Sequence, residues 1–273
     1  MSAFATSEII EQGEFPLEGK IVDLGIEIES AALENVDAAA WNAGLGVAPE
    51  ARIQQTVQGA QIRWLMEGQY PFFLRALQEG KAVGQFYLHR GFVHPDLMQW
   101  ARPLLKTSLL HRLWGVLSWF GGPVIFDHDR YEEILRAFLR EVEQLSRRYG
   151  IAAIKDATPA FYGGEVDWDM IDAVYGEFAY EKRARATIVL DVDTDLEALW
   201  SGLTKEARQK VRKAERQDIR IVEDNTAAGL DRYYEVRLEN VRRNGLRPPS
   251  RASILATEPV YMRDGMAKLL LAE

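Results

Sequence analysis

LTKEARQKVRKAERQDIRIV, residues 203–222, concentrates positive charge in a helix-like stretch. Six basic residues and two acidic ones lie between Lys205 and Arg216. Apolar residues recur every three or four positions along the same stretch, which predicts an amphipathic helix with a buried apolar face and outward cations. The apolar positions are Trp200, Leu203, Ala207, Val211 and Ala214. A strand-like segment, IRIVED (219–224), follows, so the sequence predicts a helix and strand that present a cationic surface.

Three of these cations are spaced to meet on one side of the helix. Arg208 and Arg212 are four residues apart, and Lys205 precedes them by one turn, so their side chains are neighbours on the helix surface. Guanidinium groups bind phosphate oxygens in bidentate fashion. The spacing predicts an anion site for phosphate, diphosphate, a nucleotide sugar or RNA. A charge run is also typical of a solvated surface helix, and both interpretations stay open here.

Composition indicates an ordinary globular protein. The chain has 273 residues, of which 47% are apolar and 27% charged, enough for one large domain or two modest ones. Its formal net charge of −8 argues against indiscriminate nucleic-acid coating, so the basic segment is a local feature. The absence of cysteine excludes disulfides, thiolate metal sites and cysteine nucleophiles. With no signal-peptide pattern and no apolar run long enough to span a bilayer, a cytoplasmic protein is predicted.

The chain divides into two units that each run helices and then strands. The acidic, aromatic connector FYGGEVDWDMIDAVYGEF (161–178) opens the second unit. The predicted organisation is an N-terminal extension (1–20), a first domain (21–160) and a second domain (161–273), with a mixed α/β (α+β) fold. Strands are expected at 21–30, 151–157, 185–192, 219–224 and 267–273, a hairpin at 70–92, and helices at 30–45, after Pro49, at 127–150 and at 229–245.

A search for catalytic and metal-binding motifs leaves one carboxylate. The four histidines lack zinc-type spacing, and neither a P-loop nor a G-x-S-x-G motif occurs, so no metal site is predicted. RRYGIA (147–152) matches a short pattern of acetyl-CoA-binding acetyltransferases, but Gly150 closes a helix where that pattern should open one, so we interpret it as a helix C-cap. GGPVIFD (121–127) ends at Asp127, which is either a strand end or a carboxylate at the edge of a cleft.

The most apolar segment, residues 104–120, has two interpretations. KTSLLHRLWGVLSWF (106–120) contains no acidic residue and carries Lys106 and Arg112. Such a stretch is usually core, but this composition is also typical of a segment that rests on a lipid surface. Peripheral contact with the inner face of a membrane is therefore kept as an expectation.

Several segments together resemble the FemABX family. The stretch 195–223 resembles the family's signature helix, of the form L-x-x-x-x-R-x-x-I/V-R-K-A-x-x-x-G followed by a strand. Further similar segments occur in the family's order across roughly residues 35–273. They are RIQQTVQGAQIRW (52–64), KAVGQFYL (81–88), WFGGPVIFD (119–127), YYEVRLENVRRNG (233–245) and AKLLLAE (267–273).

The resemblance implies two GNAT-like domains, each a mixed sheet flanked by helices, with a cleft between them. It implies transfer of an amino acid from aminoacyl-tRNA to the peptide of a lipid- or nucleotide-linked peptidoglycan precursor, with no bound cofactor. Some relatives serve other acyl transfers in exopolysaccharide- or exosortase-linked systems, where acyl-CoA would be the co-substrate. Direct attack of an amine on an ester needs oriented reactants and a sheltered oxyanion, but no covalent intermediate. The alternative outside catalysis is a polyanion-binding fragment.

The resemblance also assigns roles to residues. Arg208 matches the arginine that contacts the precursor diphosphate, and Lys205 and Arg212 are its neighbours by helix geometry. The family pattern also expects a lysine that shares this phosphate; Gln61 and Arg63 are the closest residues here, and Arg63 is the candidate phosphate-binding cation. Asp127, after the G-P segment, is the candidate catalytic carboxylate.

The sequence departs from the family pattern at three places. Gly59 replaces the aromatic residue expected after the Q-S/T motif, and Asp218 stands where the signature helix would close at glycine. The chain ends at Glu273, within the sheet expected for the second domain. We therefore expect the second domain to be C-terminally truncated, and no donor-side catalytic lysine is assigned.

Overall fold

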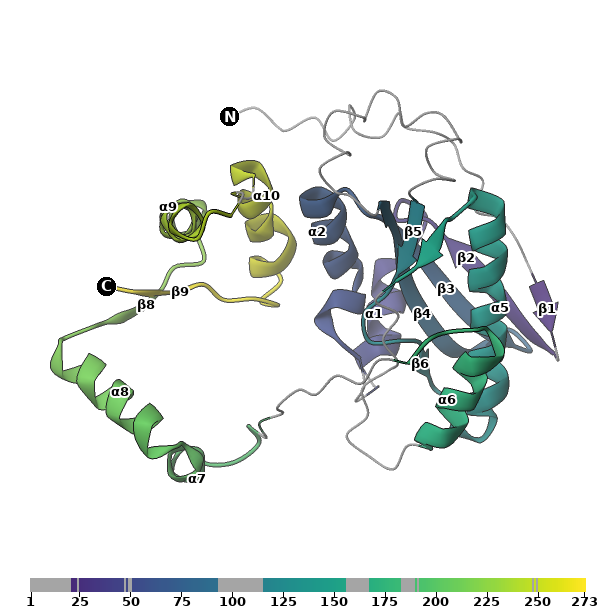
Figure 1. Cartoon of the computed structure of the whole chain (residues 1–273), viewed down its shortest axis with the longest axis horizontal. Coiled ribbons are helices and arrows are strands. Elements are labelled where there is room, and N and C mark those ends of the chain that lie inside the picture. The colour runs from purple at the N-terminus through teal and green to yellow at the C-terminus, as the bar shows by residue number, and fades with distance from the viewer. Residues whose placement is uncertain are drawn as a thin grey trace. The chain divides into compact units, whose positions relative to one another are not determined.

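The computed structural model describes residues 21–23, 25–46, 48, 51–92, 115–155, 167–182, 190, 192–246, 248 and 250–273. Contacts divide the chain into two units, one ending at Tyr180 and the other beginning at Glu181 (Figure 1). The first unit extends beyond the predicted boundary at residue 160, because helix α6 (Trp168–Glu177) buries Ile171 and Val174. Part of the predicted connector is therefore a packed helix. The N-terminal extension and most of the predicted strand 185–192 lie outside the described residues.

A mixed sheet forms the centre of the first unit. Six strands follow the order β1-β2-β3-β4-β5-β7, and the short β6 also pairs with β4. All pairs are antiparallel except β5 with β7, which is parallel. The strands are β1 (Ile21–Asp23), β2 (Ile26–Ala31), β3 (Tyr70–Gln78), β4 (Lys81–Phe92), β5 (Gly115–Ser118), β6 (Val124–Ile125) and β7 (Ala153–Ile154).

The predicted hairpin at 70–92 is confirmed as β3 and β4. Its turn residues Glu79 and Gly80 have positive φ of 50° and 78°, the backbone that suits the twist of two antiparallel strands. The predicted strand at 21–30 is two strands instead of one. Gly25, with φ of 77°, reverses the chain between β1 and β2, a conformation that glycine adopts without steric cost.

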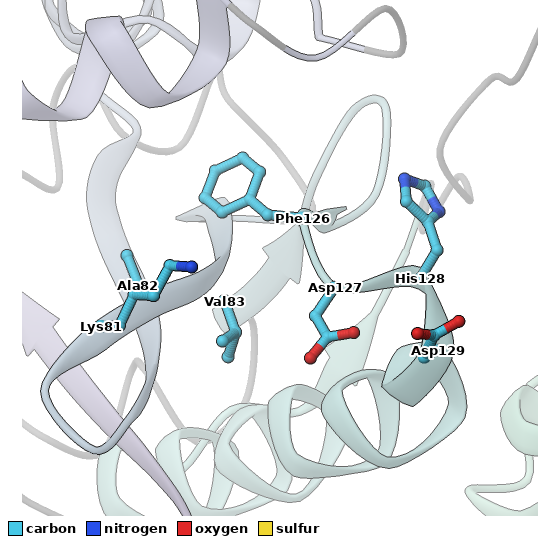
Figure 2. A pocket seen from close by; sticks show the side chains of 7 residues that line it. All are labelled: Lys81, Ala82, Val83, Phe126, Asp127, His128 and Asp129. Carbon is cyan, nitrogen blue, oxygen red and sulfur yellow. The ribbon is translucent and has the colours of Figure 1, made fainter.

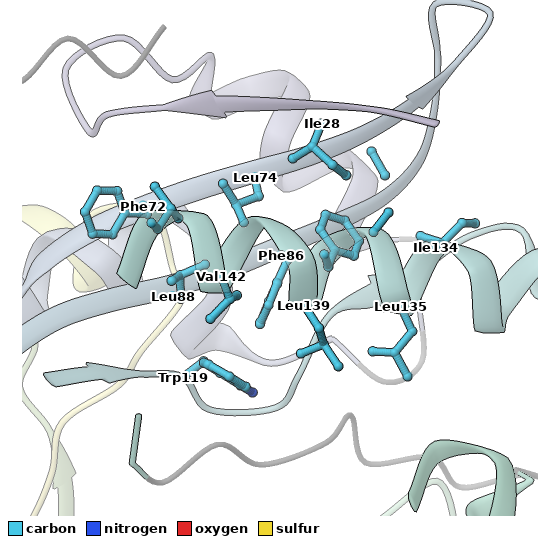
Figure 3. Packing of buried hydrophobic residues seen from close by; sticks show 14 of the residues in the cluster. Ile28, Phe72, Leu74, Phe86, Leu88, Trp119, Ile134, Leu135, Leu139 and Val142 are labelled. Atoms are coloured by element: carbon cyan, nitrogen blue, oxygen red, sulfur yellow. The ribbon is translucent and has the colours of Figure 1, made fainter. Parts of the chain in front are cut away.

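Helices cover both faces of this sheet. On one side, α1 (Ala38–Gly46) and α2 (Val57–Glu67), preceded by η2 (Ile53–Gln55), contribute to an apolar cluster that includes Phe73 and Tyr87 of the strands. On the other side, α5 (Tyr131–Tyr149), preceded by η3 (His128–Arg130), lies against Phe86 and Leu88 (Figure 3). Alternate residues of β4 thus face opposite layers, as the pleat of a strand requires.

Helix α5 ends where the sequence predicts. Gly150 has φ of 60°, and its backbone N–H donates to the carbonyls of Ser146 and Arg147. The N–H of Ile151 also donates to Ser146, at 2.8 Å. These bonds satisfy the last carbonyls of the helix with glycine in the left-handed conformation, so RRYGIA is confirmed as a helix C-cap.

Two of the family-like segments are joined by one buried side chain. Gln55 is 1% exposed; its Nε2 donates to the Gly122 carbonyl at 2.9 Å, and its Oε1 accepts from the Arg52 N–H at 2.7 Å. The Gln55 carbonyl accepts from Trp41 Nε1 at 2.8 Å. The side chain therefore connects η2 with the loop between β5 and β6.

This loop interrupts the pairing along β4, because β5 and β6 on either side of it both pair with that strand. Residues 119–123 lie opposite residues 86–88 of β4, because β4 pairs with β5 through His89 and with β6 through Gln85. The extra residues form a bulge, and Gly121 and Gly122 within it have positive φ of 88° and 64°. Residues 115–117 and Trp119 are buried, whereas Phe120 is 47% exposed. This part of the apolar segment is therefore core, and residues 104–114 lie outside the described ranges.

Two buried ionisable groups lie on opposite faces of the first unit. His89 accepts or donates a hydrogen bond with Ser118 Oγ at 2.7 Å, and burial, aided by Arg63, lowers its pKa to about 3. Glu141 of α5 is 4% exposed, and burial raises its pKa to about 7 against the opposing effect of Arg148. Its Oε2 has no hydrogen-bond partner among the described residues.

Glu141→Gln is expected to stabilise the protein above pH 7 and to change little at pH 4. A carboxyl whose folded pKa is raised favours folding when protonated, and this advantage disappears as pH rises from about 4.5 through 7. Removing the buried charge should raise the free energy of unfolding at pH 8 by about 1–2 kcal/mol, allowing for screening by nearby solvent. Urea unfolding at both pH values measures it.

Glu143→Gln is the matched control on the same helix. Glu143 is only partly buried and pairs with Arg147 at 2.6 Å, so its neutral variant should lose at most about 0.5 kcal/mol at pH 8. Equal stabilisation by both variants, or none by Glu141→Gln, would contradict a buried charge at Glu141.

The second unit contains four α-helices, a short π-helix and a small sheet among its described residues. The predicted strands at 219–224 and 267–273 and the predicted helix at 229–245 are confirmed. Only Leu230 and Ile254 are buried apolar residues of this unit in its described part. Its elements are α7 (Leu196–Gly202), α8 (Lys205–Arg216), β8 (Ile221–Glu223), α9 (Ala227–Arg243), α10 (Arg251–Leu255), the π-helix η4 (Glu258–Met262) and β9 (Leu270–Ala272).

An arginine fastens α9 to the two-stranded sheet. Arg232 donates to Asp224 Oδ2 at 2.6 Å and to Glu273 Oε1, so one side chain contacts residues that flank both strands. Among the helices that the structure describes, none combines the length and the apolar character needed to cross a bilayer.

Candidate functional site

The cationic segment is bent into a corner between two helices. Sequence periodicity predicts one continuous helix, but the backbone is extended at Leu203 and Thr204, with ψ of 144° and 154°. Thr204 then caps α8 by accepting from the Ala207 N–H at 3.2 Å. Asp195 caps α7 by accepting from Ala198 at 2.7 Å. The helix break is therefore encoded by a second capping residue inside the charged stretch.

Arg208 reaches back across this corner. Its Nη1 donates to the backbone carbonyls of Trp200, Ser201 and Leu203, at 3.3, 2.9 and 2.7 Å. These carbonyls lie at the C-terminal end of α7, where the last carbonyls lack their usual partner four residues on; the Trp200 carbonyl also accepts from the Leu203 N–H at 3.2 Å. Arg208 thus stabilises the end of α7 with one nitrogen, and every hydrogen bond of its side chain within the described residues uses Nη1.

Arg212 and Lys205 complete the cation group. The Arg212 Cζ lies 5.7 Å from the ring centroid of Trp200, within the range of a cation–π contact. Lys205 is exposed at the start of α8. Elsewhere on α8, Lys210 pairs with Glu206 at 2.7 Å. In the described part of the chain no carboxylate forms an ion pair with Lys205, Arg208 or Arg212.

The prediction that the apolar face of this segment is buried is wrong. Helices α7 and α8 contain no buried residue, and Leu203 and Val211 are 36% and 40% exposed. The reason is the small core of the second unit: its two buried apolar residues in the described part, Leu230 and Ile254, lie on other helices.

Asp127 lines an open hollow of about 320 Å³ in the first unit (Figure 2). It is half-buried, it precedes η3, and it makes no capping hydrogen bond. The hollow lies between the start of β4 and the segment that joins β6 to α5. Its lining residues are Lys81, Ala82, Val83, Phe126, Asp127, His128 and Asp129.

Arg63 lies far from the hollow, near His89 toward the end of β4. This residue of α2 donates to Gln69 Oε1 at 3.3 Å and is near His89, whose pKa its charge helps to lower. Val83 beside the hollow and His89 are six residues apart, about 20 Å along a strand. The structure therefore does not bring Arg63 and Asp127 together, and Lys205, Arg208 and Arg212 belong to the second unit.

Sequence reasoning missed the partners of the arginines. Trp200 enters the prediction as an apolar residue, yet its ring contacts Arg212 and its carbonyl accepts from Arg208. The sequence did contain a sign of the helix break: Gly202, a residue that often ends helices, stands two positions before Thr204, a residue that often begins them. Within the described ranges no group of three or more histidine or acidic side chains is placed to hold a metal ion.

Comparison with known proteins shows the fold. A crystal structure of FemX matches 89% of this chain with a TM-score of 0.62 and 16% identity, and the match covers 57% of the FemX chain. An aminoglycoside acetyltransferase from an uncultured soil metagenomic sample and a probable acetyltransferase match with TM-scores of 0.39 and 0.33. Their identities are 16% and 15%, over 61% and 62% of this chain and 99% of each of theirs.

In sequence, no protein-family model and no curated protein matches. The chain therefore has a GNAT-like mixed α/β fold that resembles FemX, and it spans little more than half the length of that protein.

Proposed function

We propose that this chain is an acyltransferase of the FemABX type, which transfers an amino acid from aminoacyl-tRNA to the peptide of a peptidoglycan precursor. The likeness of fold to FemX over 89% of the chain supports the proposal. The segment 195–223 supports it independently, because it resembles the family's signature helix in sequence.

The observation that carries the proposal is the arginine corner, which we define as Arg208 and Arg212 of α8 with the C-terminal end of α7. Two guanidinium groups one helical turn apart, with no carboxylate paired to either in the described residues, match the charge of a diphosphate. Lys205 adds a third cation on the same helix. The arginine corner is thus assigned to the diphosphate of a lipid- or nucleotide-linked precursor.

The proposed reaction joins an amine of the precursor peptide to the aminoacyl ester. The amine attacks the ester carbonyl, a C–N bond forms, and the C–O bond to the ribose breaks. The proton lost by the amine ends on the ribose oxygen, which leaves as a hydroxyl. In this proposal Asp127 receives the proton in transit and Arg63 is a phosphate-binding cation of the first unit. Orientation of the two reactants supplies much of the rate.

The acyl donor and the acceptor each allow a second possibility. An acyl thioester such as acyl-CoA offers the same electrophilic carbonyl, so an N-acyltransferase of exopolysaccharide or exosortase-linked systems is the second candidate. Assay of both donors with one acceptor distinguishes them. A lipid-linked acceptor would bring the protein to the inner face of a membrane, where the substrate itself is anchored.

Arg208→Ala is expected to weaken binding of a nucleotide-linked precursor by about tenfold to a hundredfold. The reason is the loss of charge-assisted hydrogen bonds to phosphate. Isothermal titration with the full chain measures the affinity, and thermal unfolding by circular dichroism reports separately on the loss of the carbonyl contacts of α7.

Lys210→Ala is the matched control. It removes one positive charge from the same helix at a residue that pairs with Glu206, and it should change affinity by less than about twofold. If a folded Arg208→Ala variant bound the precursor with unchanged affinity, Arg208 would not bind the diphosphate. Equal, strongly salt-dependent binding of unrelated polyanions would favour a polyanion-binding protein instead.

A further inference from the structure

Trp200 contacts both arginines of the corner through different atoms. Its ring lies beneath the Arg212 guanidinium, with Cζ 5.7 Å from the ring centroid. Its backbone carbonyl accepts from Arg208 Nη1 at 3.3 Å. One residue near the end of α7 thus touches two cations that lie one turn apart on α8.

This arrangement restricts the arginines before any ligand is present. A free arginine side chain carries about 2 kcal/mol of rotamer entropy, which is lost when the guanidinium is fixed on a ligand. A side chain that is already held loses less on binding, so affinity rises without a new contact to the ligand. Among the described residues Arg208 is held through Nη1 alone, which leaves Nε and Nη2 to donate to an anion.

A purely structural role for the Trp200 ring fits the observations less well. The side chain is only partly buried, and α7 contains no buried residue, so the ring is not part of an apolar core. Its one recorded ring contact within the described residues is with the cation of Arg212.

We propose that Trp200 is a positioning residue of the arginine corner: its ring holds Arg212 in place for a diphosphate ester, while the end of α7 holds Arg208. This inference rests on the proposed function, because it requires that the corner binds phosphate. It adds that α7 sets the geometry of the site, although the cations belong to α8.

The test is titration of the full chain with inorganic pyrophosphate, followed by calorimetry. Trp200→Leu removes the aromatic face and should weaken binding about three- to tenfold, whereas Trp200→Phe keeps a face and should bind within about twofold of the unchanged protein. Leu196→Ala is the control on the same helix, because Leu196 is 84% exposed; it should leave binding unchanged.

A double-mutant cycle separates positioning from other effects. If Trp200 acts by holding Arg212, Trp200→Leu should weaken binding by less than about twofold in an Arg212→Ala background. An equal loss in both backgrounds, or an equal loss in Trp200→Phe and Trp200→Leu, would overturn the inference. Far-UV circular dichroism of each variant checks that α7 and α8 remain folded.

Failure of the inference and failure of the proposed function give different results. Binding that weakens in Arg212→Ala and Arg208→Ala but not in Trp200→Leu overturns the role of Trp200 alone. Pyrophosphate binding that is absent, or that ignores both arginine substitutions, overturns the phosphate site and the inference together.

Discussion

Gln55→Ala is expected to lower the free energy of unfolding of the first unit by about 3–4 kcal/mol. The Gln55 side chain is fully enclosed, and both ends of its amide are hydrogen-bonded to backbone groups, at Arg52 and at Gly122. Truncation removes the side-chain partner of a partly buried N–H and of a buried carbonyl, and it opens a cavity beside the bulge. Urea unfolding followed by circular dichroism measures the loss.

Two further variants apportion this effect. Gln55→Met keeps most of the volume and removes both amide bonds, so it should lose about 2–3 kcal/mol. Gln61→Ala is the control on α2; Gln61 is half-buried and makes no side-chain hydrogen bond in the described structure, so its loss should stay below about 1 kcal/mol. If Gln55→Ala also lost less than about 1 kcal/mol, the hydrogen bonds of Gln55 to Arg52 and Gly122 would not stabilise the fold.

Gly59→Ala is expected to destabilise the first unit by about 3 kcal/mol. A Cβ atom at Gly59 would lie 2.4 Å from the Ile53 carbonyl oxygen and 2.8 Å from that of Gln54. These are backbone atoms of η2, so they cannot move aside as a flexible side chain would. The start of α2 or the 3-10 turn must shift, and thermal or urea unfolding measures the result.

Gly176→Ala is the matched control for this substitution. Gly176 is also helical, and a Cβ there would meet nothing within 4 Å. Because alanine favours helix more than glycine does, the control should stabilise α6 by up to about 1 kcal/mol. Similar destabilisation by both substitutions would contradict the close approach at Gly59.

The same geometry explains a departure from the family pattern. The resemblance expects an aromatic residue after the Q-S/T motif, and this chain has Gly59. Thr56 caps α2 by accepting from the Gly59 N–H at 3.0 Å, which draws this turn against η2. The tight turn leaves no room for a side chain at this position.

Local signals predicted much of the fold. The hairpin at 70–92, the end of α5 at Gly150 and helix α9 follow from turn residues and from periodicity, which act within a few positions of the chain. Helix α6 was missed because its acidic and aromatic residues read as a connector. Its burial depends on Ile171 and Val174 meeting a distant part of the chain.

For the candidate site, too, the sequence predicted the residues but not their long-range contacts. Sequence identified Arg208, Arg212 and Lys205 from their spacing, and the structure places all three on α8. It did not predict that Arg208 contacts the carbonyls of α7, because that contact exists only when the helix breaks at Leu203 and Thr204. The roles of Asp127, Arg63 and the three cations of α8 stay predictions that the proposed variants test.

The hydrogen bond from Gln55 to Gly122 has a consequence for inheritance. It joins two segments 67 residues apart in the chain. The acceptor is a backbone carbonyl, so any residue at position 122 supplies it, and only a side-chain amide at position 55 supplies the donor. Gly122 is constrained for a different reason, its positive φ of 64°. We therefore expect glutamine at 55 and glycine at 122 to be retained together in homologues, and an alignment of many homologues should show this pair where overall identity is too low to reveal the fold.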